Sequence, residues 1–161
     1  MSVDLFSTLP ADSKVWVFAL STSLAETDRP AIEKALKEFT GQWKAHGKSV
    51  AGDGTLMYDR FLIIAADPNV SEVSGCSIDS MFRGVKAIVN SVGADLADFA
   101  QIYYRDGESI ESVTRAAFKD LKQKGVVHDG TIVFDNSVTS LALLKSGKWE
   151  LPLAESWHAR L

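Results

Sequence analysis

Two short runs of consecutive apolar residues, VWVFAL at 15–20 and FLIIAA at 61–66, constrain the fold of this chain most strongly. Each run has the length and the β-branched and aromatic content of a buried strand. A membrane-spanning helix needs about 20 apolar residues, so neither run predicts a membrane span. We therefore expect a chain that is organised around buried strands.

Two amphipathic helices are predicted beside these strands. Pro30 is tolerated only in the first turn of a helix, and apolar residues recur every three or four positions after it. The pattern predicts a helix over residues 30–46 that Gly47 ends in a left-handed conformation. A second helix, with Ser77 as its N-cap, is predicted by a long apolar stripe. The members of this stripe are Ile78, Met81, Phe82, Val85, Ile88, Val89 and Val92.

The order of the elements predicts an α+β fold. Strands are expected at 55–58 and 61–66, although one long bent strand would give the same pattern, and at 99–104. Strand–helix–strand–strand–helix–strand is the ferredoxin-like split βαβ order, β-α-β-β-α-β. A helix at 110–124, with Ser109 as its N-cap, and a C-terminal β-hairpin of residues 131–134 and 138–144 are expected as additions. No repeat or linker divides the chain, so we expect a single domain over residues 1–161.

Composition narrows the classes of function. The net charge of −4 and the pI near 5.3 argue against a broad surface for nucleic acid or anionic lipid. A single cysteine forms neither an internal disulfide nor a paired-cysteine metal motif, and the first twelve residues do not resemble an export signal. We expect a cytoplasmic protein without metal or cofactor, and its partner could be a small molecule, another protein or a second copy of the chain.

The single cysteine, Cys76, lies in the segment SGCSID just before the second apolar stripe. Free amides and the helix dipole at a helix N-terminus favour an anion, including a thiolate. Ser74, Gly75, Ser77 and Asp79 are the neighbours that would line a polar groove for a ligand. The sequence leaves two interpretations of Cys76 open, a functional thiol and a small buried hydrophobic side chain.

Two histidines, His46 and His158, are candidate bases for this thiol. In a split βαβ fold the first helix ends where the second begins, which would bring His46 towards Cys76. His46 could equally be a cation that satisfies carbonyls at the end of its helix. We expect a small-ligand-binding or adaptor protein with a groove at residues 74–79. The alternative is a thiol-dependent enzyme with Cys76 as nucleophile and one of the histidines as base.

Five segments resemble a small bacterial protein family that is often labelled "ABC transporter ATPase". They are QWKAHG (42–47), YDRF (58–61), SGCSID (74–79), VFDNSV (133–138) and ESWHARL (155–161). The resemblance spans almost the whole chain and implies no role for any residue. A Walker A loop has four residues between its glycines and connects a strand to a helix. Here five residues separate Gly41 from Gly47, and Gly41 lies in a predicted helix, so we expect no phosphate loop.

Overall fold

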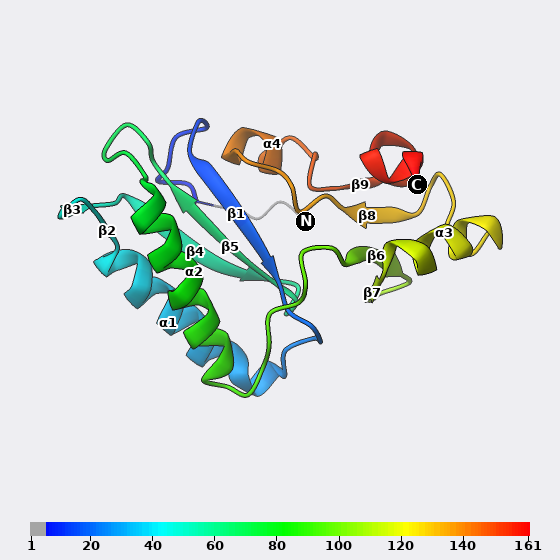
Figure 1. The fold of residues 1–161 in the computed structure, drawn as a ribbon, viewed down its shortest axis with the longest axis horizontal. Coiled ribbons are helices and arrows are strands. Elements are labelled where there is room, and N and C mark those ends of the chain that lie inside the picture. Colours follow the sequence, from blue (N-terminus) through cyan, green and yellow to red (C-terminus); the bar gives the residue numbers. More distant parts are fainter. Residues whose placement is uncertain (1–5) are drawn as a thin grey trace.

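The computed structural model describes residues 6–161 as three antiparallel sheets with four α-helices (Figure 1), which confirms the α+β class. The strands are β1 (Lys14–Ala19), β2 (Lys44–Ala45), β3 (Lys48–Ser49), β4 (Gly52–Met57), β5 (Phe61–Ala66), β6 (Ile102–Asp106), β7 (Ser109–Val113), β8 (Ile132–Phe134) and β9 (Glu150–Pro152). The α-helices are α1 (Arg29–Gln42), α2 (Gly75–Asn90), α3 (Arg115–Gln123) and α4 (Leu141–Lys145). Three 3₁₀ turns are η1 (Glu26–Asp28), η2 (Leu153–Glu155) and η3 (Trp157–Arg160).

The first sheet has the strand order β1-β5-β4, and its central strand β5 is buried along its whole length. Because successive side chains of a strand alternate between faces, Leu62 and Ile64 pack with α1 and α2, whereas Phe61 and Ile63 face the C-terminal half of the chain. Figure 1 shows α1 and α2 together on one side of this sheet and α4 on the other. Both predicted apolar runs form strands, and β5 has both of its faces covered.

The first helix is shorter than predicted. It buries Ile32 and Leu36 but ends at Gln42, since the backbone of Trp43 is already extended. Residues 44–49 form a small hairpin, β2–β3, whose two turn residues His46 and Gly47 have φ of 52° and 77°. Two successive positive φ values are the preferred geometry of a two-residue hairpin turn. The left-handed glycine was predicted correctly, but it closes a hairpin rather than a helix.

The second helix, α2, buries the centre of the predicted stripe, Met81, Val85 and Val89. It begins at Gly75, and its N-cap is Ser74, whose hydroxyl accepts a hydrogen bond from the Ser77 amide at 3.3 Å. The predicted N-cap, Ser77, lies instead in the first turn and is buried. Trp43 Nε1 donates to the carbonyl of Ser77 at 3.0 Å, so the end of α1 does lie beside the start of α2.

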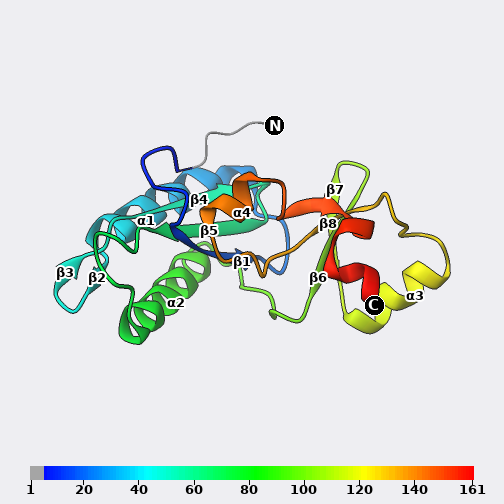
Figure 2. The same ribbon diagram turned by 90° about the horizontal axis from the view of Figure 1, so that it is seen from above.

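The strand predicted at 99–104 does not join the first sheet. The chain makes one antiparallel bridge to β1, Leu96 with Leu20, and then leaves towards a second sheet with the order β7-β6-β8-β9. Figure 2 shows this second sheet and α3 at one end of an elongated molecule. Within residues 6–161 the first sheet therefore has three strands, and the predicted ferredoxin-like order is not confirmed.

The predicted helix over 110–124 is wrong in its first part. A hairpin closed at Gly107, with φ of 61°, pairs β6 with β7, and α3 begins only after Thr114, whose hydroxyl caps the Ala117 amide. The predicted C-terminal hairpin is also wrong. β8 pairs with β9, and residues 141–145 form α4 because Ser140 caps the Leu143 amide.

The two large sheets share one apolar cluster. Phe61 and Ile63 of the first sheet belong to the same cluster as Tyr103, Phe134 and Trp149 from the second half of the chain. This shared packing supports the single domain that we expect, which stays a prediction. Among residues 6–161, no helix has the length and apolar content that crossing a bilayer requires.

Candidate functional site

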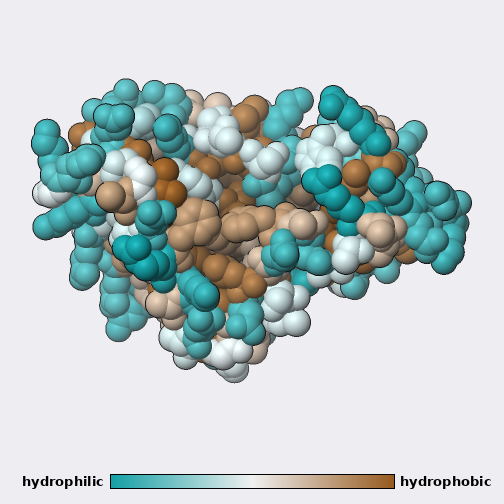
Figure 3. Space-filling view, viewed as in Figure 1, coloured by the Kyte–Doolittle hydropathy of each residue, from teal (hydrophilic) through white to brown (hydrophobic). Residues whose placement is uncertain are grey.

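A groove runs along the outer edge of β1, where no further strand of residues 6–161 joins the sheet. It encloses about 560 Å³ between β1, α2 and the loop before α4. We call it the β1 groove, and its lining residues are Asp12, Lys14–Phe18, Ile78, Phe82, Phe99 and Asn136–Ser140. Figure 3 shows hydrophobic surface gathered across the middle of this face, between two more hydrophilic ends.

Backbone groups of β1 point into the β1 groove. In an antiparallel ladder, every second residue directs its N–H and C=O away from the partner strand. The Leu20 amide bonds the Arg60 carbonyl on the β5 side, so the odd-numbered residues face outwards. On this outer side, the Val15 amide donates a hydrogen bond to the Thr139 carbonyl, and the Ala19 carbonyl accepts a hydrogen bond from the Ala97 amide.

Between those two bonds the edge is open. Among the hydrogen bonds of residues 6–161, none reaches the amide or the carbonyl of Val17, the Val15 carbonyl or the Ala19 amide on this side. Unpaired backbone groups on a strand edge are a template for another chain or for a polar ligand. The β1 groove therefore offers donors and acceptors in a regular row.

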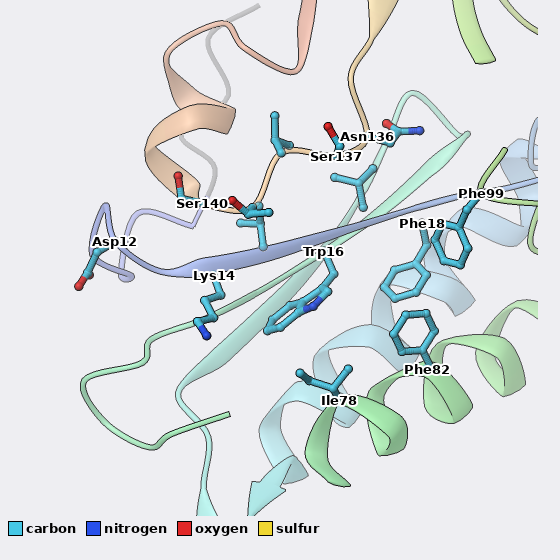
Figure 4. Close-up of a pocket in the computed structure, with 14 residues that line it drawn as sticks. Asp12, Lys14, Trp16, Phe18, Ile78, Phe82, Phe99, Asn136, Ser137 and Ser140 are labelled. Carbon is cyan, nitrogen blue, oxygen red and sulfur yellow. The ribbon is translucent and has the colours of Figure 1, made fainter. Parts of the chain in front are cut away.

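Aromatic side chains form the wall of the groove beneath this edge. Phe18 packs edge-on against Phe82 with ring centroids 5.1 Å apart, and Phe99 lies 6.0 Å from Phe82. Phe99 is 72% exposed, which is unusual for a large apolar side chain. Figure 4 shows Trp16 and Ile78 continuing the wall, with Lys14 at its end. The wall is apolar, and its one cation lies at the end where β1 begins.

The predicted groove at residues 74–79 has a different character. Cys76, Gly75 and Asp79 are exposed, so the interpretation of Cys76 as a buried hydrophobic side chain is wrong. The Ser77 hydroxyl donates to the Ser74 carbonyl at 2.8 Å, and the Ser74 hydroxyl is the helix cap. Both serine hydroxyls thus hold the first turn of α2. The role of this segment in binding stays a prediction, and its neighbour Ile78 reaches the β1 groove.

The two candidate bases lie in different places. His46 is exposed in the β2–β3 turn and lines a cavity of about 270 Å³ with Lys48 and residues 68–72. His158 belongs to η3, which lies at the opposite end of the molecule from the start of α2 in both Figure 1 and Figure 2. The structure therefore brings the end of α1 beside the start of α2 but does not bring η3 there.

His158 is enclosed rather than available. It is 1% exposed, its Nδ1 lies 2.5 Å from the Ser156 hydroxyl, and its ring stacks on Trp157 with centroids 3.9 Å apart. Burial lowers the pKa of His158 to about 4, against a smaller opposing effect of Asp135. The imidazole is therefore neutral at pH 7, and it holds the C-terminal turn together.

Tyr58, Asp59 and Arg60 of the YDRF segment line a second polar concavity, which was not predicted from the sequence. Tyr58 and Asp59 both have positive φ, 56° and 53°, which an aromatic side chain adopts only under constraint. The Tyr58 hydroxyl donates to Glu150, and Asp59 accepts two hydrogen bonds from Arg29 at 2.7 and 2.6 Å. Burial, followed by the contact with Glu150, raises the pKa of Tyr58, so the phenol remains a donor. These contacts supply the constraint.

Arg60 completes this turn. It is buried, and it donates to the carbonyls of Leu20, Ser21 and Ile110 and to the Ser112 hydroxyl. A role for Arg60 was not predicted, and the one signal in the sequence is that a charged residue directly precedes a fully apolar strand. The guanidinium joins the segment directly after β1 to β7 of the second sheet.

The P-loop and metal predictions concern other parts of the chain. Gly47-Lys48-Ser49 lies in the β2–β3 hairpin and precedes β4, not a helix. Within residues 6–161, no three His, Cys, Asp or Glu side chains are grouped as metal ligands would be. Comparison of the chain with protein-family models, curated proteins and solved structures gave no match.

Proposed function

We propose that this chain is a binding domain, of the small-ligand or adaptor kind, whose site is the β1 groove. The observation that carries the proposal is the open edge around Val17, which lies over an apolar wall. Ligand sites are typically concave and apolar with a few convergent polar groups. The β1 groove has both features, and its polar groups are backbone atoms that no side-chain rotation removes.

We further propose that β1, α1, β4, β5 and α2 form a ferredoxin-like split βαβ unit without its fourth strand. The order β1-β5-β4 supports this, since a fourth strand would pair with β1 on the open side. The bridge between Leu20 and Leu96 is antiparallel, as the first pair of that strand would be. The β1 groove then occupies the position of the missing strand.

The proposal moves the predicted site by about one helical turn. A groove was expected at residues 74–79, and the β1 groove includes the next turn of α2 through Ile78 and Phe82. We keep the family resemblance as part of the proposal, without the ATPase activity, because the GKS sequence precedes no helix.

Fluorescence of 1-anilinonaphthalene-8-sulfonate, an apolar anion, tests the site. We expect the dye to bind the native protein and to bind less to Phe99→Ser, since Phe99 lines the groove and is 72% exposed. Val126→Ser is the matched control, because Val126 is 57% exposed and does not line the groove. Equal binding by both variants, or no binding to the native protein, would contradict the proposal.

A further inference from the structure

We propose that the occupant of the β1 groove is the C-terminal end of a partner polypeptide, added to β1 as a short antiparallel strand. This inference rests on the proposed function and specifies the chemistry of the ligand. Strand addition uses backbone hydrogen bonds for affinity and side-chain pockets at alternating positions for specificity.

The length of the open edge limits the added segment to three residues. At one end the Ala97 amide donates a hydrogen bond to the Ala19 carbonyl, and at the other the Val15 amide donates one to the Thr139 carbonyl. Among residues 6–161, nothing pairs with β1 at the positions opposite Trp16, Val17 and Phe18. At about 3.4 Å per residue, a segment of three residues spans this gap.

Direction follows from the segments at the two ends. The pairs Leu20 with Leu96 and Lys14 with Ser140 are both antiparallel, and both strands that flank β5 are antiparallel to it. A segment in the same direction continues the existing pairing. Its central residue then exchanges two hydrogen bonds with Val17, whose amide and carbonyl both face the gap.

The side chains of the added segment face two different surroundings. Directly opposite residues of paired strands lie on the same face. The first and third residues would therefore lie on the side of Phe18 and Trp16, against the aromatic wall that Phe82 and Phe99 extend (Figure 4). The central residue would face Ser137 and Val138. The structure thus selects apolar residues at the first and third positions and tolerates a small polar residue between them.

The gap is closed at both ends. Ala97 occupies the place opposite Ala19, and Thr139 and Ser140 occupy the two places beyond Trp16, so the upstream part of the partner chain must leave the edge of β1 before Ala97. We place the C-terminus opposite Trp16, because a terminus needs no exit past Thr139 and carries a carboxylate. Lys14 lies at this end of the groove, is exposed, and has no ion-pair partner among residues 6–161. Asp12, its acidic neighbour, accepts hydrogen bonds from the Asn69 amide.

A second copy of the chain does not fit through the same edge. β1 is a continuous strand of six residues, and symmetric pairing of two β1 edges would place all six in a gap of three. The partner is therefore a free chain end with the pattern apolar–any–apolar–carboxylate.

Selection from a displayed library of heptapeptides with random sequence and a free C-terminus tests this inference. We expect enriched sequences with apolar residues at the last and the third-last positions. The best sequence is then synthesised with a fluorescein label, and its anisotropy is measured with the native protein. The same peptide with a C-terminal amide, and with N-methylation at its second-last residue, should bind at least about fivefold more weakly, since each change removes one predicted polar contact. N-methylation of the last residue is the control, because that amide points away from β1.

Two protein variants report the same contacts from the other side. Lys14→Gln should lower the affinity for the peptide with a free carboxylate to that of the amidated peptide. It should leave the affinity for the amidated peptide unchanged. Val17→Pro removes the outward amide and no bond to β5, and Val17→Ala controls for the loss of packing. If Val17→Pro fails to fold, the N-methyl peptides measure the same hydrogen-bonded pair.

The outcomes separate this inference from the proposed function. Competition between the dye and a selected peptide, with the expected losses, supports both. Dye binding that depends on Phe99 without any enriched peptide, or with equal binding of the N-methyl and amide peptides, overturns the strand-addition inference and leaves the groove as a small-ligand site. Peptide binding that is unaffected by Lys14→Gln and by amidation overturns the choice of a chain end. Absence of both dye and peptide binding overturns both proposals.

Discussion

Acidification should destabilise this protein through His158. The side chain is 1% exposed, and burial lowers its pKa to about 4 from an unperturbed value of 6.5. Above pH 6.5 the histidine is neutral in both the folded and the unfolded chain, so it adds no pH dependence. Below pH 6.5 the unfolded chain binds a proton that the folded chain excludes until the pH approaches 4. The stabilising contribution is thus present above pH 6.5 and is lost as the pH falls towards 4.

The size of the effect follows from the same two values. At about 1.4 kcal/mol per pH unit, the interval from 6.5 to about 4 corresponds to a loss of roughly 3 kcal/mol in the free energy of unfolding. A loss of that size is a large part of the stability of a small domain. The packing of Trp157 and Phe118 around the ring excludes the water that would solvate the charge.

Urea denaturation at pH 7.5, 6.0, 5.0 and 4.5, followed by circular dichroism, measures this loss. We expect His158→Phe to be less stable than the native protein at pH 7.5, because it loses the Ser156 contact, and to show a shallower decline on acidification. His128→Phe is the control, since His128 is exposed and should keep the native pH dependence. Parallel pH profiles for the native protein and His158→Phe would refute the reasoning.

Three further predictions concern other sites. Arg60→Met should lower the free energy of unfolding by roughly 3 kcal/mol, because it leaves buried carbonyls without donors, whereas the exposed Arg83→Met should change it little; equal denaturation midpoints would contradict this role. Cys76 should react with iodoacetamide under native conditions, because it is exposed, and a requirement for denaturant would show that the thiol is covered. Calorimetric titration with Mg-ATP should give no binding heat, since Lys48 follows a hairpin turn and precedes no helix; micromolar binding that is lost in Lys48→Ala would show a phosphate site that the fold does not explain.

Local sequence predicted the elements whose apolar pattern is long and regular. α2 and β5 are examples, because one face of α2 and both faces of β5 are buried against many neighbours. Sequence reasoning failed where a short segment is compatible with two structures. Residues 110–113 were assigned to a helix, but the β-branched Ile110 and Val113 also suit a strand once β6 lies beside them. The cap at Thr114 was the local signal that would have separated β7 from α3.

The candidate site was harder to predict than the fold. Trp16, Phe18 and Phe82 were recognised as apolar, but their use as a wall depends on a strand that leaves the sheet after Ala97. The choice of a partner strand is a tertiary property, and β6 pairs with β7 and β8. The exposure of Cys76 likewise depends on what packs over the first turn of α2, which residues 74–79 do not encode.

The buried contacts of Arg60 have a consequence for the lifetime of the folded state. Its partners Leu20 and Ile110 lie 40 and 50 residues away along the chain, on opposite sides in sequence. These hydrogen bonds can close only after both sheets have formed and met, so we expect them to be absent from the transition state for folding. Interactions of this kind leave the folding rate unchanged and slow unfolding. Arg60 would then slow unfolding and so lengthen the lifetime of the folded molecule.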